Sequence, residues 1–401
     1  MGNLFRGWAP DAIAQIHSDL FTKADHTVCT TYYHLPDSSE FSLFRPWKIA
    51  LLFKQMLCFA IGRRDTLGHW VRLENLLSWS RQLAPDVIYA RPTNKPTFYW
   101  WLPQQLAKCL DIPYATHIMD DWPARYETKT GWRNNVFWKP LLRSSLQSLF
   151  EGAVVNLGIS NEMCQAYQER YHSSFVPFHN CIEISNWSHV EKSYDANEEF
   201  QLVYLGAVTE DKELQSLVDI RNVVLSLREQ GHGVRLLIYS ASFWQDTIEK
   251  HLAHPPGVTY RGYVEPSDLP RVLSRADLLV LPINFDQRSL TYVGYSLQTK
   301  VPQYMASGTP VLLYAPASSP NTRYAARERW GMLVDQPDKA KLKEAIIKLM
   351  QEPSLRAKLG QRARALAFRE HDAVQVRQRF RKVMSDVALG TYRKGESTNG
   401  V

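Results

Sequence analysis

Short apolar runs of strand length alternate with longer helical patterns along most of this 401-residue chain. Such alternation is typical of βαβ units, in which helices join the parallel strands of one sheet. In the first half, we expect strands at residues 26–33, 86–90, 114–118, 153–159 and 175–178. In the second half, we expect them at residues 201–205, 234–239, 258–262, 277–282, 310–314 and 331–334. The predicted fold class is therefore α/β, with doubly wound parallel sheets.

The chain is longer than a single hydrophobic core usually serves, which predicts two Rossmann-like domains that face a cleft. The predicted parts are a first domain, a polar linker, a second domain, a helix that crosses back to the first domain and a disordered tail, at residues 1–190, 191–199, 200–365, 366–389 and 390–401. Residues 10–20 have a helical pattern where such domains usually open with a strand. The first strand of the first domain is therefore expected to be missing.

The net charge of +7 and the pI near 9.0 favour an anionic partner, such as nucleic acid, an acidic membrane face or a phosphate-bearing substrate. No helix-turn-helix, zinc-finger or aromatic-basic single-strand pattern is present, so nucleic acid is not expected as a partner. The five cysteines are odd in number and widely spaced, as in reduced cytosolic proteins. No signal peptide or bilayer-spanning apolar run is evident. We therefore expect a cytoplasmic protein.

Ligands of open parallel sheets bind beyond the carboxyl ends of the strands, so the residues that follow each strand are the first candidates. Gly206 ends the first strand of the second half, and Lys212 opens the next helix. Ser296 and Thr299 stand where a later helix is expected to begin, with Lys300 in its first turn. Unpaired N–H groups and the positive end of the helix dipole would favour a diphosphate there. A turn glycine, a solvated lysine and ordinary helix caps are the alternative interpretation.

The donor motif of GT-B glycosyltransferases of the glycosyltransferase group 1 kind often reads P-S/T-K-x-x-E-Y-x-A-x-G-x-P-V. Residues 296–311, S-L-Q-T-K-V-P-Q-Y-M-A-S-G-T-P-V, resemble this motif, and the order of the flanking segments is similar from residue 200 to residue 336. The resemblance implies a GT-B fold and a nucleotide-sugar donor, with residues 1–190 as the acceptor-side domain and residues 200–365 as the donor domain. It also favours retention of stereochemistry and transfer without a metal or cofactor.

The same resemblance assigns expected roles to residues of this chain. Backbone N–H groups near Gln298 and Thr299 would bind the donor diphosphate, with Lys212 and Lys300 as counter-charges. Gln303 would face the ribose, and Tyr263 lies in the stretch that usually contacts the base.

Two departures from the motif concern the ribose and sugar end of this site. Tyr295 and Gln303 stand where the family has the two glutamates of its Glu-x7-Glu pair, and no arginine lies near Val208. Gln303 can still hydrogen-bond a ribose hydroxyl, although a neutral group binds less strongly than a carboxylate. Tyr295 can stack on a sugar but cannot act as a carboxylate. Unusual donor specificity and an inactive member are both open interpretations.

The end of the expected strand 114–118 and the segment after it carry the catalytic candidates His117, Asp120 and Asp121. A carboxylate beside a histidine in a cleft can orient a hydroxyl or accept its proton. A capping aspartate and a core histidine are the alternative interpretation. A carboxylate acting as a base would suit inversion, so the sequence leaves the stereochemistry open. No D-x-D motif is placed to bind a metal, so we expect no metal ion at this site.

Residues 45–64 are apolar with basic residues at both ends and are too short to span a bilayer. They suit either a helix on an anionic membrane surface or a buried helix of the first domain. Trp132, Arg133, Trp138, Lys139 and Arg143 form a second aromatic-basic group. Peripheral membrane association is one of the two interpretations.

The leading functional hypothesis is a hexosyltransferase-type glycosyltransferase of polysaccharide biosynthesis that uses a nucleotide-sugar donor and a glycan or lipid-linked acceptor. The alternative is a catalytically silent sugar- or nucleotide-binding protein of the same fold. A sugar-nucleotide epimerase or a phosphorylase-like enzyme is a third hypothesis. A NAD-type enzyme is disfavoured because no G-x-G-x-x-G follows a first strand.

Overall fold

The computed structural model describes residues 2–17, 25–34, 67–92, 98–128, 130–132, 135–136, 139–195 and 198–393. These residues form two compact units. The first unit draws on the ranges Met1–Thr116, Arg143–Val155 and Arg377–Lys394, and the second on His117–Leu142 and Asn156–Val376. The predicted donor residues and the predicted catalytic residues all belong to the second unit. The predicted domain boundaries stay a prediction.

The first half of the chain contains four parallel strands in the order β3-β4-β5-β6. The strands are β3 (Ile88–Ala90), β4 (Tyr114–Ile118), β5 (Val155–Gly158) and β6 (Phe175–Pro177). The helices here are α1 (Gly2–Phe5), α3 (Leu67–Leu83), α4 (Phe98–Leu110), α5 (Trp122–Glu127), α6 (Lys139–Gly152), α7 (Asn161–Tyr171) and α8 (Ser185–Ser188). The bounds of these strands lie within two residues of the predicted bounds, because their apolar runs are flanked by helical patterns.

The start of the chain differs from the prediction. Residues 10–20 were expected to be helical, but η1 (Pro10–Ala12) is a single 3-10 turn and β1 (Ala14–His17) is a strand. β1 pairs in parallel with β2 (Thr31–His34) as a separate two-stranded sheet, with Ile16 opposite Tyr33. The helical spacing of Ile13 and Ile16 was misleading, because pairing with a distant strand decides the conformation. The expectation that a first strand is missing is therefore wrong for this segment.

The second half forms a parallel six-stranded sheet in the order β12-β11-β10-β7-β8-β9. Its strands are β7 (Phe200–Leu205), β8 (Val234–Tyr239), β9 (Val258–Tyr260), β10 (Leu278–Pro282), β11 (Val311–Tyr314) and β12 (Met332–Val334). All six predicted strands are confirmed, since each is a short Val-, Leu- or Ile-rich run. The strand order reverses between β7 and β10, where open α/β sheets bind their ligands.

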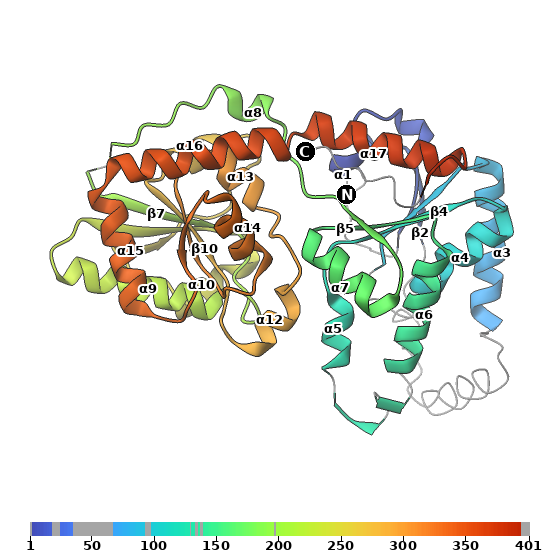
Figure 1. Ribbon diagram of the computed structural model, residues 1–401, viewed down its shortest axis with the longest axis horizontal. Helices are drawn as coiled ribbons and strands as arrows, with labels where there is room; N and C mark the ends of the chain where they lie inside the picture. The colour runs from blue at the N-terminus through green and yellow to red at the C-terminus, as the bar shows by residue number, and fades with distance from the viewer. Residues whose placement is uncertain are drawn as a thin grey trace. The chain divides into compact units, whose positions relative to one another are not determined.

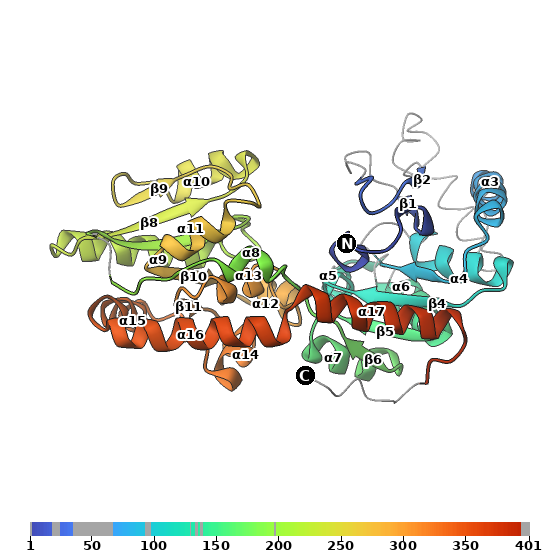
Figure 2. The same ribbon diagram turned by 90° about the horizontal axis from the view of Figure 1, so that it is seen from above.

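Two groups of helices cover the faces of this sheet (Figure 1 and Figure 2). One face packs against α9 (Leu214–Glu229), α10 (Gln245–His251) and α15 (Lys339–Gln351). The other face packs against α11 (Leu269–Arg275), α13 (Val301–Ala306), α14 (Pro320–Glu328) and α16 (Pro353–Glu370). The remaining helices are α12 (Gln287–Val293) and α17 (Ala373–Ala388). Helices α15, α16 and α17 follow one another without a strand between them.

Two features bear on the predicted membrane contact. No helix among the described parts of the chain is long and apolar enough to cross a membrane. Residues 45–64, with Arg133 and Trp138, lie outside the described residues. Peripheral membrane association therefore stays a prediction.

Helix α16 approaches the end of α13 very closely at Gly308. Gly308 has φ +72° and follows α13, and glycine often has a positive φ just after a helix end. A Cβ atom at Gly360 of α16 would overlap the Gly308 carbonyl oxygen, which also accepts a hydrogen bond from the Tyr194 hydroxyl at 3.0 Å. The missing side chain at Gly360 therefore allows α13, which follows Lys300, to sit against α16.

We predict that Gly360→Ala destabilises the protein by about 1–3 kcal/mol, because the new methyl group overpacks this contact. An alanine in a helix is normally more stable than a glycine by about 1 kcal/mol, so the predicted sign is opposite to the helix propensity. Urea unfolding measures the change. Gly233→Ala is the matched control, since its Cβ would lie 3.6 Å from the nearest atom, and it should change little. An unchanged or raised stability of Gly360→Ala would contradict the account.

Candidate donor site

Gly206 ends β7 at the point of the sheet where the strand order reverses. Its φ of +146° is unfavourable for side-chain-bearing residues, and a Cβ there would lie 2.5 Å from Nζ of Lys300. Glycine is thus required both for the backbone turn and for the lysine beneath it. The structure brings these two predicted donor residues together.

Lys300 is partly buried under this turn. Its Nζ donates to the Tyr204 hydroxyl at 3.0 Å and lies 4.2 Å from the centre of that ring. Burial lowers the pKa of Lys300 to about 8, with nearby Glu213 raising it and Lys212 lowering it. The ammonium has therefore lost much of its solvation, and no carboxylate among the described residues bonds to it directly. An anion placed over Gly206 would restore the charge balance.

The predicted helix N-terminus lies later than expected. Helix α13 begins at Val301 with Lys300 as its N-cap and Pro302 in its first turn, so Ser296 and Thr299 precede the helix. The Gln298 N–H group donates to Oδ1 of Asn321 at 3.1 Å. This N–H group was expected to bind the diphosphate, but in the structure it donates its hydrogen bond to the side-chain amide oxygen of Asn321. Thr299 is exposed.

The side chain of Gln298 offers a different polar contact. Its Oε1 and Nε2 are buried and have no hydrogen-bond partner within the described ranges. The hydroxyl of Ser296 is also buried and has no hydrogen-bond partner among the described residues. Buried polar groups are normally satisfied, so these atoms mark a place where a polar ligand or solvent belongs.

The remaining predicted donor residues surround this loop with different degrees of exposure. Gln303 and Tyr295 are half-buried, and the Tyr295 carbonyl accepts a hydrogen bond from the Ser160 hydroxyl at 2.6 Å. Tyr263 follows β9 and is 62% exposed. All three are therefore accessible enough to touch a ligand, and their roles in binding stay predictions.

Two buried asparagines missed by the sequence interpretation fix the loops of the site. Asn284 follows β10, accepts from the Ser216 N–H at 3.0 Å, and donates its Nδ2 to the Glu210 carbonyl at 2.8 Å. Its own N–H donates to the Lys212 carbonyl at 2.7 Å, which fixes the backbone of the predicted lysine. Inspection of the residues after each strand would have found Asn284. Asn321 has no such signal, because it lies within α14.

The three catalytic candidates have three different environments. His117 lies on β4 and is buried, whereas Asp120 is exposed in the following turn. Asp121 precedes α5, is 0% exposed, and forms a bidentate ion pair with Arg170 at 2.8 and 3.0 Å. It also accepts from the Tyr167 hydroxyl at 3.0 Å. These contacts use both carboxylate oxygens, so Asp121 stabilises the packing of α5 against α7.

The arrangement can neutralise an anion at the carboxyl ends of β7 and β10 through Lys300. Within the described residues, no group of three or more His, Cys, Asp or Glu side chains is placed to bind a metal ion. The predicted absence of a cofactor stays a prediction.

Residues 199–352 match the profile of the family described as Glycosyl transferases group 1. A search of curated proteins found no match. Among solved structures, sucrose-phosphate synthase from Thermosynechococcus elongatus is 14% identical, with a TM-score of 0.61 over 79% of this chain and 77% of that chain.

Two further solved structures have the same fold. HepE from Anabaena, in complex with UDP and glucose, is 13% identical, with a TM-score of 0.60 over 90% of this chain and 87% of that chain. WaaG, a glycosyltransferase involved in lipopolysaccharide biosynthesis, is also 13% identical, with a TM-score of 0.52 over 73% of this chain and 85% of that chain. The chain therefore has the GT-B fold, and its residues 199–352 match the model of the glycosyl transferases group 1 family.

Proposed function

We propose that this protein is a glycosyltransferase that moves a hexosyl group from a nucleotide-sugar donor to a glycan or lipid-linked acceptor. The observation that carries the proposal is the partly buried Lys300 beneath Gly206, at the reversal of strand order in a glycosyl transferases group 1 domain. The unsatisfied amide of Gln298 supports it, since it offers both a donor and an acceptor to a ligand.

The proposed chemistry is electrostatic. Transfer of the sugar leaves a nucleoside diphosphate, whose negative charge grows as the bond to the sugar breaks. A preorganised ammonium in a poorly solvated site stabilises such a charge more than water does. Lys300 is suited to this role, and Lys212 adds a second cation, which supports transfer without a metal.

The nucleotide of the donor is proposed to be UDP, because HepE of the same fold was solved with UDP and glucose. The acceptor is proposed from the sequence alone. A silent binding protein is a second candidate, favoured by the ion pair that occupies both oxygens of Asp121.

A screen of UDP-, GDP- and ADP-sugars tests the proposal directly. We expect donor-dependent product or slow donor hydrolysis with at least one of these sugars, with UDP-glucose tested first. Turnover would be followed by the release of nucleoside diphosphate. Binding without turnover across the whole panel would instead establish the silent protein.

The pKa of Lys300 predicts how donor binding depends on pH. A bound diphosphate stabilises the ammonium and raises its pKa above the value of about 8 in the free protein. Below pH 8 Lys300 is already charged in the free protein, so its ionisation should not change the affinity for UDP with pH. Above pH 8 binding must take up a proton, and the affinity for UDP should fall by up to about tenfold per pH unit until the pKa of the complex is reached. Calorimetry in buffers of different ionisation enthalpy measures both the affinity and the proton uptake.

Two variants separate this effect from general loss of charge. Lys300→Gln should bind UDP weakly and without the fall above pH 8. Lys212→Gln removes a neighbouring cation of the same site and should weaken binding while keeping the fall. If wild-type affinity is constant between pH 7 and pH 9.5, Lys300 does not bind the diphosphate.

Asp121 is predicted to act in folding and not as the catalytic base. Asp121→Asn should lower the free energy of unfolding by about 3–5 kcal/mol, because the Arg170 guanidinium loses its charged partner in a largely buried place. Asp120→Asn is the matched control and should leave stability unchanged, because Asp120 is exposed. Urea unfolding and turnover per folded molecule would be measured together. A stable Asp121→Asn protein without turnover would restore Asp121 as the catalytic candidate.

A further inference from the structure

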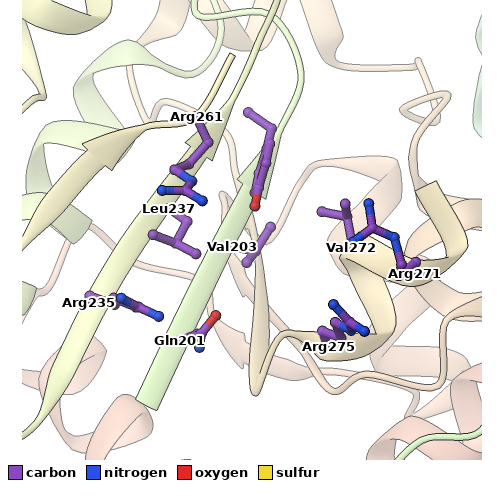
Figure 3. A pocket seen from close by; sticks show the side chains of 9 residues that line it. Gln201, Val203, Arg235, Leu237, Arg261, Arg271, Val272 and Arg275 are labelled. Carbon is purple, nitrogen blue, oxygen red and sulfur yellow. The ribbon is translucent and has the colours of Figure 1, made fainter. Parts of the chain in front are cut away.

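A cavity of about 240 Å³ lies against the face of the six-stranded sheet, between β7, β8 and α11. None of the predicted donor residues lines it. Four of its nine lining residues are arginines, namely Arg235, Arg261, Arg271 and Arg275. In Figure 3, Arg235 and Arg261 come from the strand side of the cavity, and Arg271 and Arg275 come from the helix opposite.

The alternation of the strands explains why these side chains meet. Val234, Leu236 and Ile238 of β8 are fully buried on the face covered by α9, so Arg235 and Leu237 point to the opposite face. On α11, Leu273 is fully buried in the core of that opposite face. Arg271 and Arg275 lie four residues apart, on one side of the helix. Three separate segments of the chain thus deliver guanidinium groups to one cavity.

This arrangement gathers four positive charges around one cavity. Like charges four residues apart on a helix repel each other. Arg271 pairs with Asp268 at 3.0 Å, and Arg235 lies 3.5 Å from Glu199, which also binds Arg228. The Nε atom of Arg235 is buried and finds no hydrogen-bond acceptor within the described part of the chain. An anion in the cavity would satisfy this donor and reduce the repulsion.

The chemistry of the lining indicates the class of anion. Guanidinium groups bind phosphate oxygens through paired, charge-assisted hydrogen bonds. Val203, Leu237 and Val272 give the cavity an apolar part as well, which suits a phosphate joined to an organic group. We propose that this cavity binds a phosphate-bearing anion, a phosphomonoester or a diphosphate, at a second site separate from the donor diphosphate.

Titration calorimetry with inorganic pyrophosphate, in the presence of saturating UDP, tests the proposal on the full chain. Arg271→Ser/Arg275→Ser should lower the affinity for pyrophosphate by about tenfold or more, because two charge-assisted contacts are lost. Lys348→Ser/Lys358→Ser is the matched control, since it removes the same charge from exposed positions on α15 and α16, and it should bind as the wild type does. Arg261→Ser provides an independent single substitution with the same expected direction.

Binding of UDP alone distinguishes this site from the donor site. The arginine variants should bind UDP as the wild type does, whereas Lys300→Gln should bind UDP weakly and keep the arginine-dependent binding of pyrophosphate. The proposal would be overturned if Arg271→Ser/Arg275→Ser and Lys348→Ser/Lys358→Ser lowered the affinity for pyrophosphate equally. It would also be overturned if neither double variant lowered that affinity. If UDP does not bind at all but pyrophosphate binding still depends on the arginines, the proposed function fails and this inference stands.

Vesicles identify the source of the phosphate. Cosedimentation with phosphatidic acid vesicles would be compared with cosedimentation with phosphatidylcholine vesicles. Stronger binding to phosphatidic acid that Arg271→Ser/Arg275→Ser loses would assign the site to a lipid headgroup. Pyrophosphate binding without such a gain would assign it to a soluble phosphate compound. Each result supports the phosphate chemistry of the cavity.

Discussion

The contact of Lys300 with the underside of Gly206 is the constraint on which the proposed donor site depends. It needs a glycine at the end of β7, a tyrosine hydroxyl below to accept the ammonium hydrogen, and a helix that begins just after the lysine. The position of that helix depends in turn on Gly360 of α16, which admits the Gly308 carbonyl. The position of the poorly solvated Lys300 ammonium, where the strand order of the sheet reverses, therefore depends on helix packing at Gly308 and Gly360.

The loops around this lysine are held by neutral amides. Asn284 fixes the backbone of Lys212, and Asn321 fixes the segment from Ser296 to Gln298. Such hydrogen bonds preorganise a site without adding charge, so the charges around Lys300 are those of Lys212 and Glu213. The expected replacement of two family carboxylates by Tyr295 and Gln303 would have the same effect, since neither side chain carries a negative charge at neutral pH.

Local pattern predicted the regular elements well, because short β-branched runs and helical periods are encoded by neighbouring residues. β4 and β8 have the predicted bounds, whereas residues 10–20 were misassigned because β1 pairs with a strand 17 residues away. The site was predicted less completely for the same reason. Arg170 is 49 residues from Asp121, and Asn321 is 23 residues from Gln298, so no local pattern reveals either partner. To predict the arginine cavity, one must know toward which face of the sheet each strand residue points.

The central claim is that a donor diphosphate lies over Gly206 against Lys300. A crystal structure of the protein with UDP measures this most directly. The account predicts a phosphate oxygen within hydrogen-bond distance of Lys300 Nζ, beside the Gly206 backbone, and the uracil toward Tyr263. A UDP diphosphate bound in the arginine cavity between β8 and α11, with no ligand at Gly206, would contradict it.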